Sequence, residues 1–217
     1  MANKKANEEL VAIRPLDIKE VKIKIVGDTP LIVHAWSEKA KRMMLEAQTK
    51  ATKVKAKAIR DPYDEFINSM YWLTPKPEST VEDFEKAVKN GAKWGFPVGA
   101  FKMAGNAAAY RSGWVKNQME LRGSYFLRTE HGDMAEIKGS TPIIREDMVR
   151  IGMGSADLRY RAEFQEWYTE LILEYNASGN LTLEQIVNTI NAGGYIVGIG
   201  EWRPEKDGNF GRYHIEM

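Results

Sequence analysis

The sequence predicts an α+β fold, and three observations favour it. Val21, Ile23 and Ile25 alternate with lysines, which is the period of a strand with one face on a core. Residues 182–185 read Thr-Leu-Glu-Gln, a capping box at the start of an amphipathic helix. Strand character flanks that helix at 164–175 and 195–200. The C-terminal part is therefore expected to be a β-α-β unit with a right-handed crossover.

The first strand is expected to end at Asp28-Thr29-Pro30, where turn residues interrupt the alternation. A short apolar run, 31–36, follows, and Ser37 is a suitable N-cap for a helix. In 38–60, apolar residues recur with helical spacing, and basic residues form a second stripe. The basic stripe consists of Lys39, Arg42, Lys50, Lys53, Lys57 and Arg60.

The basic charge of the chain is local, although the net charge of all 217 residues is only +1. Residues 1–60 carry 14 Lys and Arg against 7 Asp and Glu, and the segment from Lys39 to Arg60 contains a single acid, Glu46. A helix that is merely solvated usually mixes both signs. We therefore expect this stripe to bind either phosphates or the acidic surface of a neighbouring protomer.

The middle of the chain is expected to alternate loops and helices. Residues 61–80 are predicted as loop around a short apolar piece, 66–73. Thr80 should cap a helix that ends before Gly91. Segment 37–94 is thus predicted to be a helical insertion. A Gly-Pro turn then opens a small-residue helix within 95–113, whose first turn offers free N–H groups and Lys102 to an anion.

Further along, 121–138 is predicted to form a hairpin that turns at His131-Gly132-Asp133. Residues 139–163 give no clear assignment. In 164–175, alternate residues from Trp167 to Tyr175 share one face of a strand. The helix that starts after Thr182 is expected to end at Gly193 or Gly194.

The C-terminal stretch 198–213, GIGEWRPEKDGNFGRY, is predicted to be a Gly-rich hairpin. Its glycines permit close approach of a ligand to the backbone, or simply tight bends, and both interpretations stay open. Flanking arginines could bind phosphates, and aromatic residues could stack on bases. The candidate binding residues are Gly198, Gly200, Trp202, Arg203, Gly208, Phe210, Gly211 and Arg212.

Two β-α-β units, the first interrupted by inserts, predict a ferredoxin-like (RRM-like) core. The expected organisation is an N-terminal extension at 1–18 and one domain at 19–217, with the helical insertion at 37–94 inside it.

Three stretches, taken in order, resemble the RAMP superfamily. They are a first strand that runs into 29–31, the turn 96–102 that opens an Ala-rich helix, and Gly198-x-Gly200 followed by Gly208-x-x-Gly211. The likeness is to the backbone subunits that polymerise along guide RNA in CRISPR effector complexes, or to a phage-encoded relative. It implies RNA binding and self-assembly. Gly99 and Ala100 replace the usual Ser-Ser, and no Asp matches the one that some of these subunits use to cut RNA.

Several classes of site and location are not expected. The chain has no cysteine, and its three histidines lack ligand spacing, so no metal or cofactor is predicted. The sequence contains no apolar run near 18 residues and no signal peptide, so membrane contact is not expected. The expected location is the cytoplasm, which would be that of a bacterial host cell if the protein is phage-encoded.

The leading hypothesis is a non-catalytic binder of single-stranded RNA or DNA that assembles head-to-tail into a filament or helical array. Two alternatives stay open. One is a metal-independent endoribonuclease of the RAMP type that uses His34 or His214 as acid or base, although each histidine is more simply a structural residue. The other is a phage structural or assembly protein that makes only protein contacts.

Overall fold

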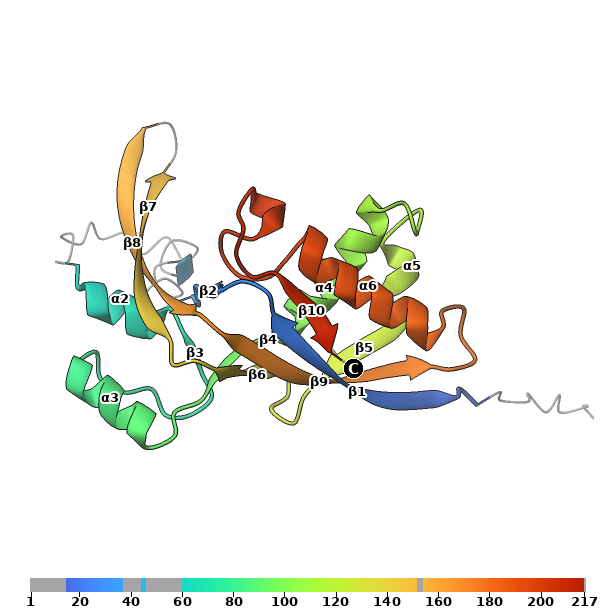
Figure 1. Ribbon diagram of the computed structural model, residues 1–217, viewed down its shortest axis with the longest axis horizontal. Coiled ribbons are helices and arrows are strands. Elements are labelled where there is room, and N and C mark those ends of the chain that lie inside the picture. The colour runs from blue at the N-terminus through green and yellow to red at the C-terminus, as the bar shows by residue number, and fades with distance from the viewer. Residues whose placement is uncertain (1–14, 37–43, 46–59, 152–153, 217) are drawn as a thin grey trace, which may run out of the picture.

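The computed structural model of the protein describes residues 15–36, 44–45, 60–151 and 154–216. This part of the chain is α+β, as predicted, and its sheets are mostly antiparallel (Figure 1). The described elements comprise five α-helices, one short 3-10 helix and ten strands that form a large and a small sheet.

The large sheet has the strand order β10-β1-β9-β6-β4-β3, and β5 also pairs with β9. The central pair is long: β1 and β9 run antiparallel in register from Ile18 opposite Asn176 to Val26 opposite Tyr168. The predicted alternation is confirmed, because Ile23 and Ile25 are buried. The strands are β1 (Ile18–Gly27), β3 (Tyr71–Trp72), β4 (Trp94–Pro97), β5 (Tyr125–Arg128), β6 (Met134–Gly139), β9 (Trp167–Asn176) and β10 (Tyr213–Glu216).

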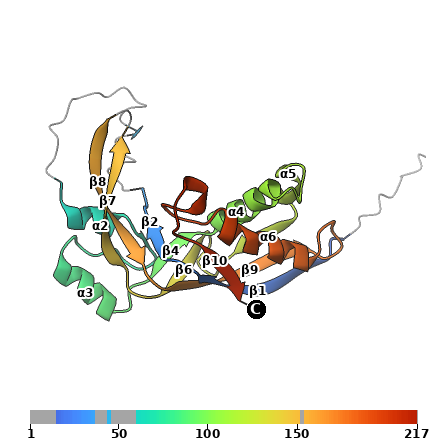
Figure 2. The same cartoon turned by 45° about the horizontal axis from the view of Figure 1, so that its top comes forward.

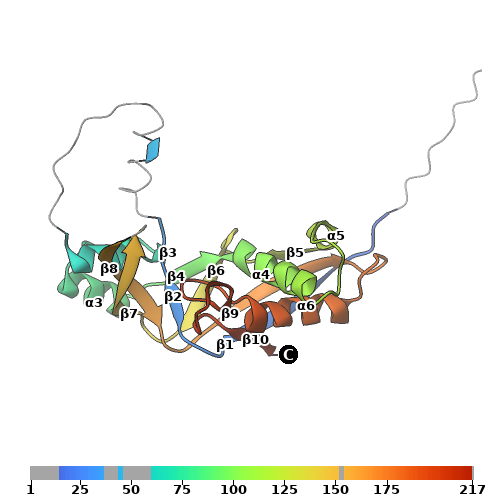
Figure 3. The same ribbon diagram turned by 90° about the horizontal axis from the view of Figure 1, so that it is seen from above.

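Two helices, α4 (Val98–Arg111) and α6 (Leu183–Ile196), lie side by side on one face of this sheet (Figure 3). The core between helices and sheet includes Phe101, Leu171 and Ile190, all fully buried. The capping box is confirmed: Thr182 Oγ1 accepts from the Gln185 N–H, and the Gln185 side chain accepts from the Thr182 N–H.

The predicted end of α6 at Gly193 or Gly194 is wrong, because the helix continues to Ile196. Both glycines serve packing rather than termination. A Cβ on Gly193 would lie 2.6 Å from the Gly105 nitrogen of α4, and one on Gly194 would lie 1.9 Å from the Tyr213 carbonyl oxygen. The small residues thus let α6 approach both α4 and β10.

The loop predicted for 61–80 is wrong in part, because these residues contain the helix α2 (Pro62–Asn68) and the short strand β3. Asp61 caps α2 by accepting from the Tyr63 N–H, and Pro62 occupies the first turn, where its missing N–H is harmless. The second helix, α3 (Val81–Lys89), begins at Thr80 as predicted. It ends before Gly91, which has a φ of +79°.

The small sheet has the order β2-β8-β7 and lies beside α2 and α3 (Figure 1). Its strands are β2 (Leu31–Val33), β7 (Ile143–Ile151) and β8 (Ser155–Phe164). The hairpin of β7 and β8, which the sequence left unassigned, projects from the body of the molecule. One of its faces carries charges that pair across the strands: Arg145 binds Glu163 at 2.7 Å, and Arg161 binds Asp147 at 3.2 Å.

The hairpin predicted for 121–138 is wrong, although the turn at His131 and Gly132 is present. Both β5 and β6 pair antiparallel with β9 along the same edge, with Arg128 opposite Ile172 and Lys138 opposite Tyr168. The two strands therefore run in the same direction, and the residues between them loop out.

The C-terminal stretch is a folded loop and not a hairpin, and Tyr195–Gly200 is not a strand. Residues after α6 form a loop with one turn of 3-10 helix, η1 (Pro204–Lys206), and then enter β10. Figure 2 shows this loop between the start of α4 and β2. A C-terminal β-α-β unit is present as β9-α6-β10, with β10 in place of the strand expected at 195–200, since β9 and β10 both run antiparallel to β1.

Candidate nucleic-acid interface

Two segments that the sequence singled out line one open groove of about 620 Å³, together with His34 just after β2. The start of α4 contributes Ala100 and Lys102, and the loop after α6 contributes residues 198–201 and Arg203. These residues are distant in sequence, and only the fold brings them together.

Segment 29–31, the first of the three stretches that resemble the RAMP superfamily, is hydrogen-bonded to the C-terminal loop. The Gly211 N–H donates to the Pro30 carbonyl at 2.8 Å, and the Arg212 N–H donates to Thr29 Oγ1 at 3.0 Å. The Glu201 N–H donates to the Ile32 carbonyl at 3.0 Å. The end of the first strand therefore positions the Gly-rich loop through backbone bonds.

The glycines of the loop contact the protein's own backbone. A Cβ on Gly208 would lie 1.7 Å from the Trp202 carbonyl oxygen, and one on Gly211 would lie 1.8 Å from the Ile199 carbonyl oxygen. Gly200 packs in the same way on the Ile32 carbonyl. These contacts account for the glycines by loop packing, while Gly198 and Gly200 also line the groove.

Arg203 is held inside the loop. Its guanidinium donates to Glu205 at 2.7 and 3.0 Å and to the Gly200 carbonyl at 3.0 Å. Arg111 binds the same carboxylate at 2.7 Å. These bonds, chiefly those from Arg203, hold the pKa of Glu205 below its usual value. The positive charge of Arg203 is thus largely compensated.

At the end of the groove next to β2, His34 Nδ1 lies 3.6 Å from Glu201 Oε1. Arg161, which is buried, approaches the other oxygen of that carboxylate at 3.9 Å. The contact with His34, and then the charge of Arg161, lower the pKa of Glu201. This corner of the groove is therefore a compensated charge cluster.

Lys102 ties α4 to the segment that follows it. Its ammonium donates to the carbonyls of Arg122 and Tyr125 at 2.8 and 2.6 Å and lies 4.4 Å from the centre of the Phe126 ring. Burial lowers the pKa of this lysine. The geometry gives Lys102 a structural role, and its predicted contact with an anion stays a prediction.

The aromatic candidates differ in what they contact. Phe210 stacks on the Arg145 guanidinium at 4.5 Å and so joins the loop to the β7–β8 hairpin. Arg212 lies over the exposed Tyr195 ring at 4.8 Å. Trp202, with a φ of +51°, leaves 37% of its surface exposed. Trp202 is therefore the candidate with a ring surface open to a base.

Most of the predicted basic stripe lies outside the described residues: Lys39, Arg42, Lys50, Lys53 and Lys57. Arg60 is described, and its guanidinium binds Glu65 at 2.6 and 2.8 Å as well as Asp157 and the Leu158 carbonyl. These partners raise its pKa. Arg60 thus anchors the start of 60–94 to β8.

Each of the three histidines has a carboxylate neighbour that sequence spacing did not reveal, and that of His34 is Glu201. His214 Nδ1 lies 2.6 Å from Asp28 Oδ1, across the β1–β10 pair. His131, predicted as a turn residue, lies in the turn with Nε2 3.2 Å from Glu136. A histidine that acts as a base requires a carboxylate that orients its ring. Of the two candidates, His214 has the more favourable geometry, because its carboxylate lies at 2.6 Å and that of His34 at 3.6 Å.

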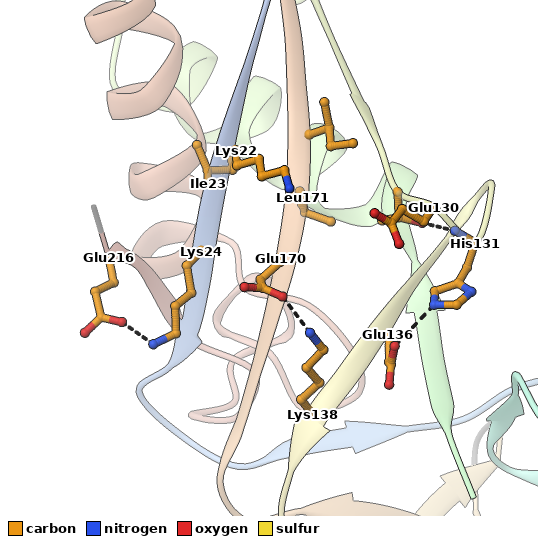
Figure 4. A pocket seen from close by; sticks show the side chains of 12 residues that line it. Lys22, Ile23, Lys24, Glu130, His131, Glu136, Lys138, Glu170, Leu171 and Glu216 are labelled. Atoms are coloured by element: carbon orange, nitrogen blue, oxygen red, sulfur yellow. Dashed lines mark hydrogen bonds and ion pairs between the residues drawn. The ribbon is translucent and has the colours of Figure 1, made fainter. Parts of the chain in front are cut away.

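The open face of the large sheet holds a second hollow, of about 520 Å³, shown in Figure 4. Two of its three lysines are paired with carboxylates: Lys138 binds Glu170 at 2.5 Å, and Lys24 binds Glu216. Both lysines also lie within 6 Å of the centre of the Tyr168 ring, at 5.2 Å for Lys24 and 5.9 Å for Lys138.

Two groove residues were missed by sequence reasoning. Gln118 precedes α5 (Met119–Arg122), a helix of four residues in a segment without any motif, and Arg122 is its last residue. No periodic signal exists in so short a helix, and only the folded structure places it against α4.

No protein-family model matches the chain, and no curated protein is significantly similar to it. None of the helices in the described part of the chain is both long and apolar enough to span a bilayer.

Proposed function

We propose that the protein is a non-catalytic binder of single-stranded nucleic acid, RNA or DNA, and that the strand lies in the groove between α4 and the C-terminal loop. The observation that carries this proposal is that segments distant in sequence meet at one groove. Segments 96–102 and 198–203 were singled out for nucleic-acid binding and line one groove, and 29–31 supports its wall.

The strand order supports a ferredoxin-like core of the RAMP type as the scaffold of this groove. The order β10-β1-β9-β5, with α4 before β5 and α6 before β10, is that of a β-α-β-β-α-β arrangement with insertions. In this proposal α2, α3 and the β7–β8 hairpin are the inserted parts.

The chemistry of the groove suits a flexible anionic polymer. Binding of a single strand without sequence preference requires a positively charged track and aromatic surfaces for stacking. The groove offers Arg122, and Trp202 is exposed on the adjoining loop. Stacking on an aromatic side chain contributes about 1 to 3 kcal/mol per base.

We further propose that copies assemble head-to-tail into a filament or helical array, since a heterologous contact that does not close generates a helix. The projecting hairpin supports this proposal because its apolar side chains are exposed, with Met148 71% accessible and paired with Leu158. Whether the stripe from Lys39 to Arg60 contacts nucleic acid or the next protomer can be decided by experiment.

A triple variant with Lys50, Lys53 and Lys57 changed to Glu separates these two roles. Loss of binding together with a flatter salt dependence would assign the stripe to phosphate contact. Unchanged affinity with loss of assembly would assign it to the protomer interface.

The central test compares binding to single-stranded RNA, single-stranded DNA and duplex at two salt concentrations, with electron microscopy of the products. We expect one single-stranded polymer to bind with strong salt dependence and to induce filaments or rings. Absence of a mobility shift with every oligonucleotide at low salt would overturn the proposal and favour the phage structural or assembly protein.

The endoribonuclease remains a second candidate because His214 has Asp28 as an orienting partner. It predicts cleavage of a hairpin RNA in EDTA, lost in His214→Ala and strongly reduced in Asp28→Asn. Intact RNA after prolonged incubation with the wild-type protein would exclude this activity for that substrate.

A further inference from the structure

We infer that Arg122 is the principal phosphate contact of the groove and that Lys102 positions it, an inference that rests on the proposed function. Arg122 is exposed at the C-terminal end of α5, and the groove extends along that helix. Neither α5 nor Arg122 belongs to any of the segments that the sequence singled out for nucleic-acid binding.

Arg122 differs from the other basic groups that line the groove because its charge is free to bind a phosphate. Lys102 donates to two carbonyls, Arg203 is bound by Glu205, and His34 lies beside Glu201. The Arg122 guanidinium has no ion pair or side-chain hydrogen bond with another residue in 15–36, 44–45, 60–151 or 154–216. Its charge is therefore uncompensated in this part of the chain.

The backbone of Arg122 is nevertheless fixed. Its carbonyl accepts the Lys102 ammonium at 2.8 Å, and the preceding residue, Leu121, is buried. A mobile side chain on a fixed backbone keeps the charge at one wall of the groove. The bond from Lys102 accounts for a half-buried lysine in this place, since it joins α4 to the end of α5.

Gln118 extends the same wall. It precedes Arg122 by four residues and lines the groove with it. An Arg fork donates two parallel hydrogen bonds to a phosphate, and a Gln amide can donate to a neighbouring phosphate or sugar oxygen. The pair therefore fits consecutive phosphates of one strand.

The opposite wall offers the phosphates no unpaired cation. There Arg203 and Arg111 bind Glu205, and Glu201 lies beside His34 and Arg161. The phosphate track thus runs along α4 and α5, and the bases point toward the C-terminal loop, where Trp202 is exposed.

The experiment measures binding of the full chain to fluorescent poly-U RNA and poly-dT DNA of about 20 nucleotides across a salt series. We compare wild type with Arg122→Gln, Arg122→Lys, Lys102→Met and Lys138→Gln. Lys138→Gln is the matched control, because it removes one charge from the open sheet face. Circular dichroism melting of every variant verifies that it is folded.

For Arg122→Gln we expect roughly tenfold weaker binding and a log K against log salt slope that is shallower by about 0.7. Arg122→Lys should keep the slope, because a charge still meets the phosphate, while losing part of the affinity. Lys102→Met should weaken binding with an unchanged slope, as expected of a positioning residue. Lys138→Gln should change neither.

If the wild type binds and Arg122→Gln binds with the same affinity and the same salt slope, the inference is overturned and the proposed function stands. A shallower slope in Lys102→Met, but not in Arg122→Gln, would transfer the phosphate contact to Lys102. If the wild type binds neither polymer, the proposed function fails, and this inference fails with it.

Discussion

The groove and the open face of the large sheet each present four basic residues, but they differ in how those charges are used. On the sheet face, Lys138 is matched by Glu170 and Lys24 by Glu216, while Lys22 has no ion pair among the described residues. In the groove, Arg122 has no such partner among the described residues. An ion pair attracts a polyanion weakly, because the carboxylate repels what the ammonium attracts. The balance of charges therefore distinguishes the two surfaces: three lysines face four carboxylates on the sheet side, whereas two lysine and arginine charges beyond Arg122 face only two carboxylates in the groove.

The two regions also differ in how their glycines are used. Gly211 behind the groove and Gly132 beside the sheet face have nearly the same φ, +66° and +67°. Only Gly211 is in close contact, since a Cβ would lie 1.8 Å from the Ile199 carbonyl oxygen, whereas Gly132 has open space around it. The first loop is therefore held by packing and the second is not.

The largest expected effect is on the free energy of unfolding and compares Gly211 with Gly132. Gly211→Ala should lower the free energy of unfolding by about 3 kcal/mol or more, because backbone must move in addition to the strain of a positive φ. Gly132→Ala should cost only about 1 kcal/mol. Urea unfolding followed by circular dichroism measures both. Equal losses in the two variants would contradict the packing explanation.

The next effect concerns stacking. Trp202→Ala should weaken binding of the single strand by about 1 to 3 kcal/mol, since the exposed ring is the best placed to meet a base. Tyr168→Ala on the sheet face should leave affinity within a factor of about two, because its ring lies between two paired lysines. The opposite ranking in a fluorescence titration would move the binding surface to the sheet face.

A smaller effect depends on pH. The pKa of Glu201 is lowered in the folded protein, so its stabilising contribution is present above the unfolded value of about 4.3 and is lost as the pH falls through the lower folded value. Glu201→Gln should cost at most about 1 kcal/mol at neutral pH, because the side chain is partly exposed, and nothing in strong acid. Unfolding curves recorded from neutral to strongly acidic pH should show the stabilities of the wild type and Glu201→Gln becoming equal as the pH falls. Glu130→Gln is the control.

The smallest effect is expected on the sheet face. Lys138→Met breaks the pair with Glu170, whose side chain is 59% exposed. Exposed pairs contribute little, so thermal denaturation should show a change within about 0.5 kcal/mol. A loss above about 1 kcal/mol would mean that these pairs stabilise the sheet and do more than neutralise its surface.

The sequence predicted elements whose signals are local. The strand around Ile23 and the caps at Thr80 and Thr182 are confirmed because alternation and capping depend on a few adjacent residues. Errors arose where a distant contact overrides the local rule. Gly193 and Gly194 stay inside α6 since α4 and β10 approach them, and 143–164 forms a hairpin whose charges pair across strands.

The candidate site was predictable in part for the same reason. Segments 96–102 and 198–203 carry recognisable residue types, and the fold brings them to one groove. The partners of Lys102 and Arg203 could not be inferred, because each lies on an element whose position depends on tertiary packing. Arg122 was missed altogether, since nothing around it in the sequence marks a site.

The looped-out residues between β5 and β6 have a practical consequence. Because both strands are held in register by β9 and not by each other, added length between His131 and Gly132 should leave either pairing undisturbed. The chain contains no cysteine. A short inserted peptide with one cysteine would therefore carry a unique thiol, and a dye attached there could report on the protein from the sheet side while the groove stays untouched.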